Sequence, residues 1–144
     1  MTYVADTISA SGREWRKVQG ASEQDISELR KVLPFEPPAE YLDFLRFSNG
    51  GEGELALDPL WFQLFEVAFA IKLWQDRNYR NEYPDYFIFG SNGGLESIAF
   101  DMSQAEPWPF VAVDCIAGLD SANKIAENVH AFIQKVGLHA EEKP

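Results

Sequence analysis

The sequence is poor in cysteine and histidine, and both shortages exclude kinds of structure and chemistry. Its one cysteine, Cys115, has no partner within the chain, so a disulfide-built framework is excluded. Its two histidines, His130 and His139, are nine residues apart and do not supply the converging ligands that a metal site needs. We therefore expect neither a metal nor another cofactor.

Long apolar runs are also missing. No stretch approaches the about 20 apolar residues that a membrane-spanning helix requires. Residues 1–6 lack the basic start and the apolar centre of a signal peptide. These two absences predict a cytoplasmic protein that does not act at a membrane.

Basic residues are few. The chain has 12 Lys and Arg against 23 Asp and Glu, which gives a net charge of −11. A negative field disfavours nucleic acids and anionic membranes as partners, because both carry the same sign of charge. It favours basic proteins and speeds their encounter with the chain. The alternative is that the charge serves only solubility.

Hydrophobic residues, in contrast, are plentiful. They make up 46% of the 144 residues, and aromatic residues make up 14%, which is typical of one packed domain. We expect an N-terminal arm at residues 1–20, a folded domain at 21–137 and a polar tail at 138–144. The arm is expected to carry a short strand or to be partly mobile.

The tetrapeptide Ser-Asn-Gly-Gly occurs twice, at residues 48–51 and 91–94. Asparagine and glycine tolerate positive φ, so each copy indicates a turn. The first copy follows a helix-like stretch and is expected to end it through a left-handed cap. The second follows a strand-like stretch and is expected to lead into another strand. The predicted structural turn residues are Asn49, Gly50, Gly51, Asn92, Gly93 and Gly94.

Apolar periodicity predicts four helices and five strands. The first helix begins at Ser22, whose side chain can cap it near Asp25, and stops before Pro34. The others are expected at 38–47, at 66–81, and from a cap at 120–121 to Val136. Strands are expected at 54–58, 61–65, 87–89, 97–100 and 110–113. This order predicts an α+β fold with a central antiparallel sheet and helices packed around it.

Catalytic motifs are not evident. Cys115 could act as a nucleophile with His130 or His139, but a buried structural cysteine is the preferred interpretation. The many carboxylates are scattered, so no acid/base pair is singled out. The glycine-rich turns lack the Gly-Lys-Ser/Thr of a phosphate-binding loop. An enzyme would need a pocket that holds Cys115 or a carboxylate with a perturbed pKa.

Aromatic residues next to acidic ones are typical of protein interfaces. Trp61 and Trp74 are assigned to the core. At least one of Tyr79, Tyr83 and Tyr86 is expected on the surface, because acidic, amide and basic residues surround them. The predicted partner-binding residues are Glu52, Glu54, Asp76, Tyr79, Tyr83 and Asp85.

The order of these motifs resembles the SUKH superfamily over residues 21–136. One half is the capped helix, Leu33-Pro34, Tyr41-x-x-Phe44-Leu45 and Asn49-Gly50-Gly51. The other is Phe89-Gly90-Ser91-Asn92-Gly93-Gly94 and a strand that ends in Phe100-Asp101. The chain departs from the family's pattern at Leu95, where another small residue is expected after the glycines.

The resemblance implies an α+β fold with a central antiparallel sheet and no shared catalytic residues. The superfamily takes in fungal regulators of cell-wall synthesis and bacterial immunity proteins that bind a cognate polymorphic toxin, often a nuclease. We therefore predict a non-enzymatic immunity protein with a basic toxin domain as partner. The alternative is a regulatory or scaffold module. A monomer or a weak homodimer is expected.

Overall fold

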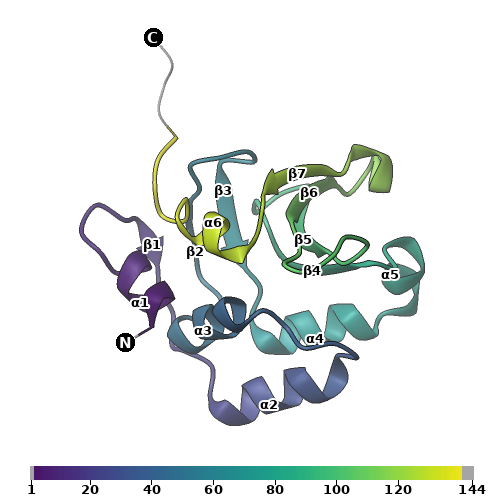
Figure 1. Cartoon of the computed structure of the whole chain (residues 1–144), viewed down its shortest axis with the longest axis horizontal. Helices are drawn as coiled ribbons and strands as arrows, with labels where there is room; N and C mark the ends of the chain where they lie inside the picture. Colours follow the sequence, from purple (N-terminus) through teal and green to yellow (C-terminus); the bar gives the residue numbers. More distant parts are fainter. Residues whose placement is uncertain (1, 141–144) are drawn as a thin grey trace.

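A seven-stranded antiparallel sheet organises the chain in the computed structural model, which describes residues 2–140 (Figure 1). Each strand pairs with the next one along the chain, in the order β1-β2-β3-β4-β5-β6-β7. The strands are β1 (Trp15–Arg16), β2 (Glu52–Glu54), β3 (Trp61–Leu64), β4 (Tyr86–Ser91), β5 (Glu96–Asp101), β6 (Phe110–Asp114) and β7 (Asn123–Ala126). The predicted α+β class with an antiparallel sheet is confirmed.

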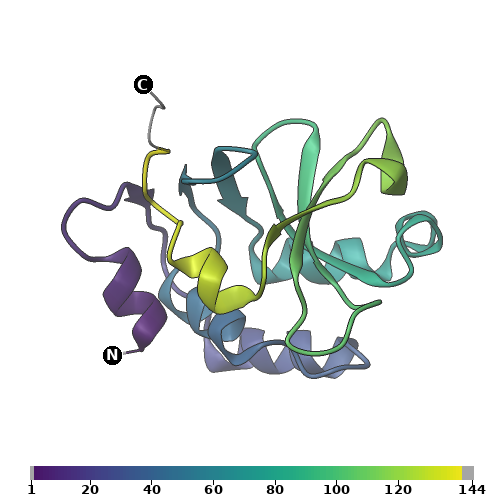
Figure 2. The same ribbon diagram turned by 45° about the horizontal axis from the view of Figure 1, so that its top comes forward.

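Helices pack around this sheet. They are α1 (Tyr3–Ile8), α2 (Glu23–Val32), α3 (Ala39–Phe47), α4 (Val67–Gln75), α5 (Arg77–Glu82) and α6 (Val129–Ile133), with a 3₁₀ turn, η1, at Gly118–Ser121. In both ribbon views α2, α3 and α4 lie together below the strands (Figures 1 and 2). Helix α1 stands beside α3, and α5 continues from the end of α4.

The first predicted helix, α2, begins where its sequence signals indicate. The Ser22 hydroxyl accepts a hydrogen bond from the Asp25 N–H at 3.1 Å, and the Asp25 carboxylate accepts one from the Ser22 N–H at 3.1 Å. This reciprocal pair satisfies two amides that a helix start leaves unpaired. Ile26 and Leu29 are buried on the inner face, so the predicted apolar face is confirmed.

The end of α3 differs from the prediction. The helix stops at Ser48, whose φ of −151° is extended, so no left-handed cap closes it. The positive φ values come later, at Gly50 (+114°) and Gly51 (+94°), where they turn the chain into β2. Asn49 instead caps the next helix, because its side-chain oxygen accepts a hydrogen bond from the Val67 N–H at 2.8 Å.

Two other predicted elements are divided differently in the structure. The helix expected at 66–81 is interrupted at Asp76, whose carboxylate accepts a hydrogen bond from the Tyr79 N–H at 3.1 Å and starts α5. The strand expected at 54–58 lies instead at Glu52–Glu54, and Leu55 adds an isolated bridge to Val136. Aspartate favours helix starts over helix interiors, which explains the break.

The last predicted helix is wrong over its first half. Residues 123–126 form β7, which pairs with β6 and satisfies backbone groups that would otherwise lie unpaired along the edge of that strand. Helix α6 begins only after Asn128, whose side chain accepts a hydrogen bond from the Ala131 N–H at 2.9 Å. Ile125 and Val129, whose four-residue spacing indicated a single helix, therefore lie in a strand and in a helix respectively.

The N-terminal arm packs onto the domain. Its short strand, β1, was one of the predicted alternatives, whereas α1 was not expected; it starts at Thr2, whose hydroxyl accepts a hydrogen bond from Ala5. The arm is fastened by residues 133–137: the Arg13 guanidinium donates to the Val136 carbonyl at 2.7 Å, and the Glu14 N–H donates to the Gly137 carbonyl at 2.7 Å. Of the predicted polar tail, residues 141–144 lie outside the described residues.

The main core is built from aromatic rings on the sheet face that α3 and α6 cover. Tyr41 of α3 lies 5.3–5.8 Å, between ring centroids, from Phe87, Phe89 and Phe100. Phe132 of α6 closes the cluster from the other side, 5.0 Å from Phe110. Most of these contacts are edge-to-face or tilted, the geometry that stabilises aromatic pairs by about 0.5–1.5 kcal/mol beyond burial.

Alternate residues of β4, β5 and β6 face a second, smaller cluster. Ile88, Ala99 and Val111 lie there, together with Tyr83 from the end of α5. Tyr83 is only 4% exposed. Burial, and secondly the Glu82 carboxylate beside it, raises the pKa of Tyr83 to about 12. Because both faces of the central strands are covered, nearly all their residues are buried.

A buried serine hydroxyl joins the arm to the first glycine turn. The Ser48 hydroxyl accepts hydrogen bonds from the indole N–H of Trp15 at 3.3 Å and the N–H of Val18 at 3.2 Å. It donates one to the carbonyl of Gly50 at 2.7 Å. Ser48 is fully buried, whereas its two donors are only partly buried.

We expect Ser48→Ala to lower the free energy of unfolding by about 1–2 kcal/mol, since two partly buried donors, the Trp15 indole N–H and the Val18 N–H, lose their acceptor. Urea denaturation followed by tryptophan fluorescence measures the change. The matched control is Ser27→Ala on the exposed surface of α2, which should stay within about 0.5 kcal/mol of the parent chain. A Ser48→Ala change as small as the control's would contradict the role of this hydroxyl.

The raised pKa of Tyr83 predicts a loss of stability in alkali. Below pH 10 the phenol is protonated in both the folded and the unfolded chain. Between pH 10 and about 12 the unfolded chain loses this proton first, so the free energy of unfolding falls with rising pH. Urea denaturation across this range should show a shallower fall for Tyr83→Phe, and equal slopes for the two proteins would contradict the prediction.

Candidate functional site

The predicted partner-binding residues fall into two separate groups, one on β2 and the other around α5, two elements that lie well apart in Figure 1. Glu52 and Glu54 lie on β2. The Glu52 carboxylate accepts a hydrogen bond from the indole N–H of Trp61 at 3.0 Å, and the Glu54 carboxylate lies 3.4 Å from His139 Nδ1. Both carboxylates therefore already have contacts within the chain. Trp61, assigned to the core, is half-buried.

The second group, Asp76, Tyr79, Tyr83 and Asp85, lies between α4 and β4. The Asp76 side chain caps α5, and Tyr83 is a core residue. Tyr79 is half-buried, and burial raises its pKa. The expectation of at least one exposed tyrosine is wrong, because Tyr86 is also half-buried. Asp85 is exposed, and its side chain makes no hydrogen bond or ion pair with the other described residues.

The second Ser-Asn-Gly-Gly copy forms the turn between β4 and β5. The Asn92 side-chain oxygen accepts hydrogen bonds from the Gly94 N–H at 2.9 Å and the Glu96 N–H at 3.1 Å, and Gly93 has a φ of +79°. Leu95, which follows this turn, is 60% exposed. The residue that departs from the family's pattern is thus an apolar side chain held in solvent.

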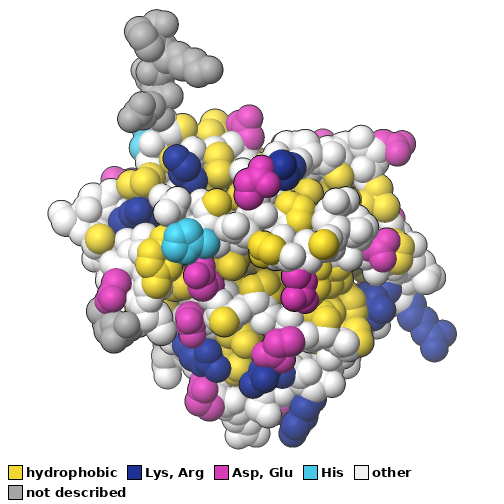
Figure 3. All heavy atoms as spheres, in the orientation of Figure 1, with side chains coloured by type: hydrophobic (Ala, Val, Ile, Leu, Met, Phe, Trp, Pro, Cys, Tyr) yellow, Lys and Arg dark blue, Asp and Glu magenta, His cyan; other side chains and the backbone are white. Residues whose placement is uncertain are grey.

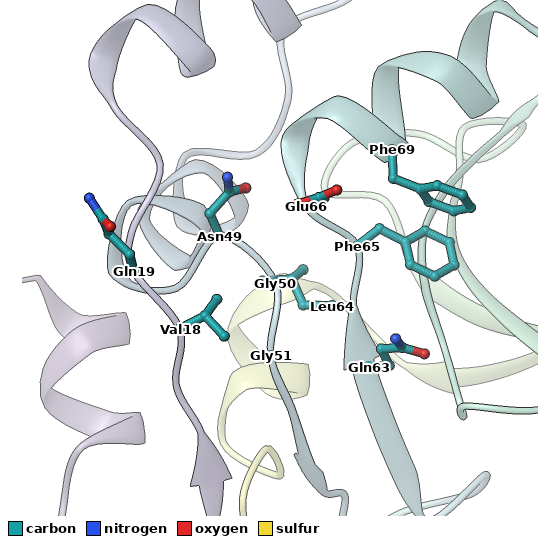
Figure 4. A pocket seen from close by; sticks show the side chains of 10 residues that line it. All are labelled: Val18, Gln19, Asn49, Gly50, Gly51, Gln63, Leu64, Phe65, Glu66 and Phe69. Atoms are coloured by element: carbon teal, nitrogen blue, oxygen red, sulfur yellow. The ribbon is translucent and has the colours of Figure 1, made fainter.

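The first glycine turn lies in the wall of an open groove of about 710 Å³ (Figure 4). The groove runs between the arm, the turn, the end of β3 and the start of α4. Gly51 sits so close to the arm that a Cβ there would lie 2.6 Å from the Arg16 carbonyl oxygen. The lining residues are Val18, Gln19, Asn49, Gly50, Gly51, Gln63, Leu64, Phe65, Glu66 and Phe69.

The chemistry of this groove suits binding. Val18 and Phe69 expose 45% and 42% of their surface, and side-chain amides supply hydrogen-bonding groups around them. Glu66 is the one titratable side chain in the lining, so the groove holds no acid/base pair or nucleophile with a base. It can accept an apolar side chain of a partner and fix it through amide hydrogen bonds.

A second hollow, of about 250 Å³, opens on the face drawn in Figure 3. Near the centre of that view hydrophobic side chains lie between α6 and the helices below it, with acidic side chains among them. Trp108 forms part of its wall and contacts Phe35 edge-to-face, with 5.4 Å between the ring centroids. The remaining lining residues are Glu36, Pro37, Pro38, Glu106, Pro107 and Val129. Proline walls and an indole form a rigid apolar hollow.

Cys115 is exposed, so the preferred interpretation of a buried cysteine is wrong. Its sulfur lies 3.2 Å from the Ser97 hydroxyl. His130 belongs to α6, where its ring stacks on Tyr3 at 4.5 Å and its Nδ1 lies 3.3 Å from a Glu40 carboxylate oxygen. The two hydrogen-bonding environments share no residue, so the structure gives no support to a cysteine–histidine pair.

Among residues 2–140, no three or more His, Cys, Asp or Glu side chains come together in a way that could hold a metal ion. Over the same residues, no helix has the length and apolar character needed to cross a membrane.

Sequence reasoning missed an apolar surface at the tips of two neighbouring turns. Leu95 follows β4, and Ile116 and Leu119 follow β6; they expose 60%, 79% and 39% of their surface. Only Leu95 carried a signal, because it replaces the expected small residue. Ile116 and Leu119 lie between the strand predicted at 110–113 and the helix cap predicted at 120–121, so nothing in the pattern set them apart.

The comparison with protein families agrees with this architecture. Residues 20–135 match the SMI1 / KNR4 family (SUKH-1), which confirms the suspected SUKH resemblance. A comparison with curated proteins finds no match. The family match includes both Ser-Asn-Gly-Gly turns and six of the seven strands, the exception being β1. Since the matched residues make up most of its length, the chain belongs to the SMI1 / KNR4 (SUKH-1) family.

Proposed function

We propose that this protein is a non-enzymatic immunity protein, which neutralises a basic toxin domain by binding it stoichiometrically. Membership of the SUKH-1 family supports a binding domain, since the superfamily has no shared catalytic motif. Its bacterial members resemble immunity proteins, and many of their toxins are nucleases. The proposal places the complex in the cytoplasm, with the protein as a monomer or a weak homodimer.

The observation that carries the proposal is the net charge of −11. Within residues 2–140 the Lys and Arg ion pairs involve only Arg30, Arg46 and Lys124, and all of them are at the surface. Exposed pairs of this kind contribute about 0–1 kcal/mol each, so they do not account for the acidic excess. Most carboxylates are left to set up a negative field around the molecule.

The negative field of this protein is complementary to the positive surface of a nuclease. A nuclease needs a basic surface to hold the phosphates of its substrate, and an acidic protein is steered toward the same surface. Once bound, the inhibitor covers the phosphate-binding residues and excludes the nucleic acid. This mechanism needs a large complementary surface and no chemical step.

We expect the protein to bind, one to one, the basic toxin domain encoded next to its own gene, supplied in catalytically inactive form. Its affinity should fall at least about tenfold between about 50 mM and 500 mM salt, because salt screens the steering charges. Isothermal titration calorimetry measures both the stoichiometry and the affinity. An unrelated basic protein, cytochrome c, serves as the control for non-specific attraction.

Two results would contradict this proposal. The first is no binding of the toxin domain at low salt. The second is a salt-sensitive affinity equal to that for cytochrome c, which would reduce the interaction to general charge attraction. Salt-insensitive binding to a non-toxin partner would instead favour the regulatory or scaffold alternative.

A further inference from the structure

We propose that the tips of two adjacent turns form the docking surface for the basic partner. This loop-tip surface consists of Leu95 in the β4–β5 turn and of Ile116 and Leu119 between β6 and β7. The inference rests on the proposed function and adds to it the part of the molecule that meets the toxin. Its partner is a protein surface with an apolar centre and surrounding Lys or Arg residues.

The two tips lie side by side because β5 pairs with both neighbouring strands. Glu96 pairs with Asp114 in the register of β5 and β6, and the Cys115 N–H donates to the Leu95 carbonyl at 2.8 Å. This bond ties one turn to the other at the point where the apolar side chains emerge. Leu95 therefore emerges next to the turn that carries Ile116 and Leu119, so the three exposed apolar residues belong to adjoining backbone segments.

The patch is held in a fixed conformation. The Asp114 carboxylate accepts hydrogen bonds from the N–H groups of Ile116 and Ala117, at 2.8 and 3.1 Å. The Ser121 hydroxyl accepts one from the Asp114 N–H at 2.8 Å and donates one to the Gly118 carbonyl at 2.7 Å. A turn that is already ordered loses little conformational entropy when a partner binds, which favours affinity.

The charge around the patch has a single sign. Residues 81–123 contain seven Asp and Glu and not one Lys or Arg. Glu96 and Asp120 flank the apolar side chains along the chain, and Glu82 of α5 approaches Gly118, where a Cβ would lie 3.7 Å from its carboxylate oxygen. An apolar centre with carboxylates around it is complementary to an apolar centre with cations around it.

The groove beside the first glycine turn is less suitable for a basic partner. Its exposed apolar residue Val18 directly follows Arg16 and Lys17 in the arm, and both of these are exposed. Two cations at one lip would repel Lys and Arg side chains of a toxin. Charge complementarity therefore selects the loop-tip surface over the groove.

The first test replaces exposed apolar residues at each place. Leu95→Ser with Ile116→Ser should weaken toxin binding about 10- to 100-fold, the loss typical of central interface residues. The matched control is Val18→Ser with Phe69→Ser in the groove, which should change the affinity by less than about threefold. Thermal unfolding of both variants checks that their folds are intact.

A second pair of changes tests the charge. Glu96→Gln with Asp120→Asn should slow association by about threefold to tenfold at low salt and reduce its salt dependence. Asp114 is left unchanged because its carboxylate holds the turn. Equal association rates of this variant and the parent protein at low salt would contradict the charge argument.

The native cysteine provides a test without any substitution. Cys115 lies between Leu95 and Ile116, is exposed, and is the only thiol in the chain. Alkylation of this thiol by iodoacetamide should slow by at least about tenfold when the toxin domain is bound, since access controls its reactivity. Mass spectrometry of the intact chain measures the rate.

The outcomes separate the two proposals. No binding of the parent protein to the toxin would overturn the proposed function, and this docking surface with it. Binding that leaves Cys115 reactive and tolerates the loop-tip substitutions would overturn the docking surface alone. A loss of affinity in the groove variant only would assign the interface to the groove.

Discussion

The first glycine turn is the constraint on which the rest of the structure depends. Four segments meet there: the arm, the end of α3, the start of β2 and the first amide of α4. The Ser48 hydroxyl and the Asn49 side chain hold them through hydrogen bonds that are buried or nearly so. Gly51 allows the arm to come within contact distance, because any Cβ would collide with the Arg16 carbonyl. The groove in Figure 4 exists because these four segments converge without filling the space between them.

Local signals in the sequence were sufficient for elements that carry their own caps or that cross the centre of the sheet. The capping pair of Ser22 and Asp25 located α2, and the apolar runs of β4, β5 and β6 located those strands. Long-range pairing decided the others. Residues 123–126 became a strand because β6 needed a partner, a requirement that helical spacing cannot reveal.

The candidate site was the least predictable part. Exposure of Ile116 and burial of Tyr83 depend on how the β6–β7 turn and α5 pack, and neither is encoded by neighbouring residues.

Charge and apolar surface are distributed unequally between the two ends of the sheet. The arm and the early helices mix acidic and basic side chains, as the face in Figure 3 shows. The segment 81–123, which contains β4, β5 and β6, has Asp and Glu but no Lys or Arg. The interior of these strands is the most aromatic part of the core, with Phe87, Phe89, Phe100 and Phe110 in mutual contact.

The fastening of the arm by residues 133–137 has a consequence during protein synthesis. Strands β2 to β7 pair in the order in which they leave the ribosome, so each new hairpin can add to the previous one. The contacts of Arg13, Glu14 and Leu55 with residues near Val136 connect the first part of the chain to the last. The nascent chain can already pair the arm with β2 and pack Trp15 against Phe44 and Phe62, but the bonds of Arg13 and Glu14 form only once residues 133–137 have been translated. Synthesis of residues 133–137, rather than formation of the central sheet, is thus the step that completes the docking of the arm.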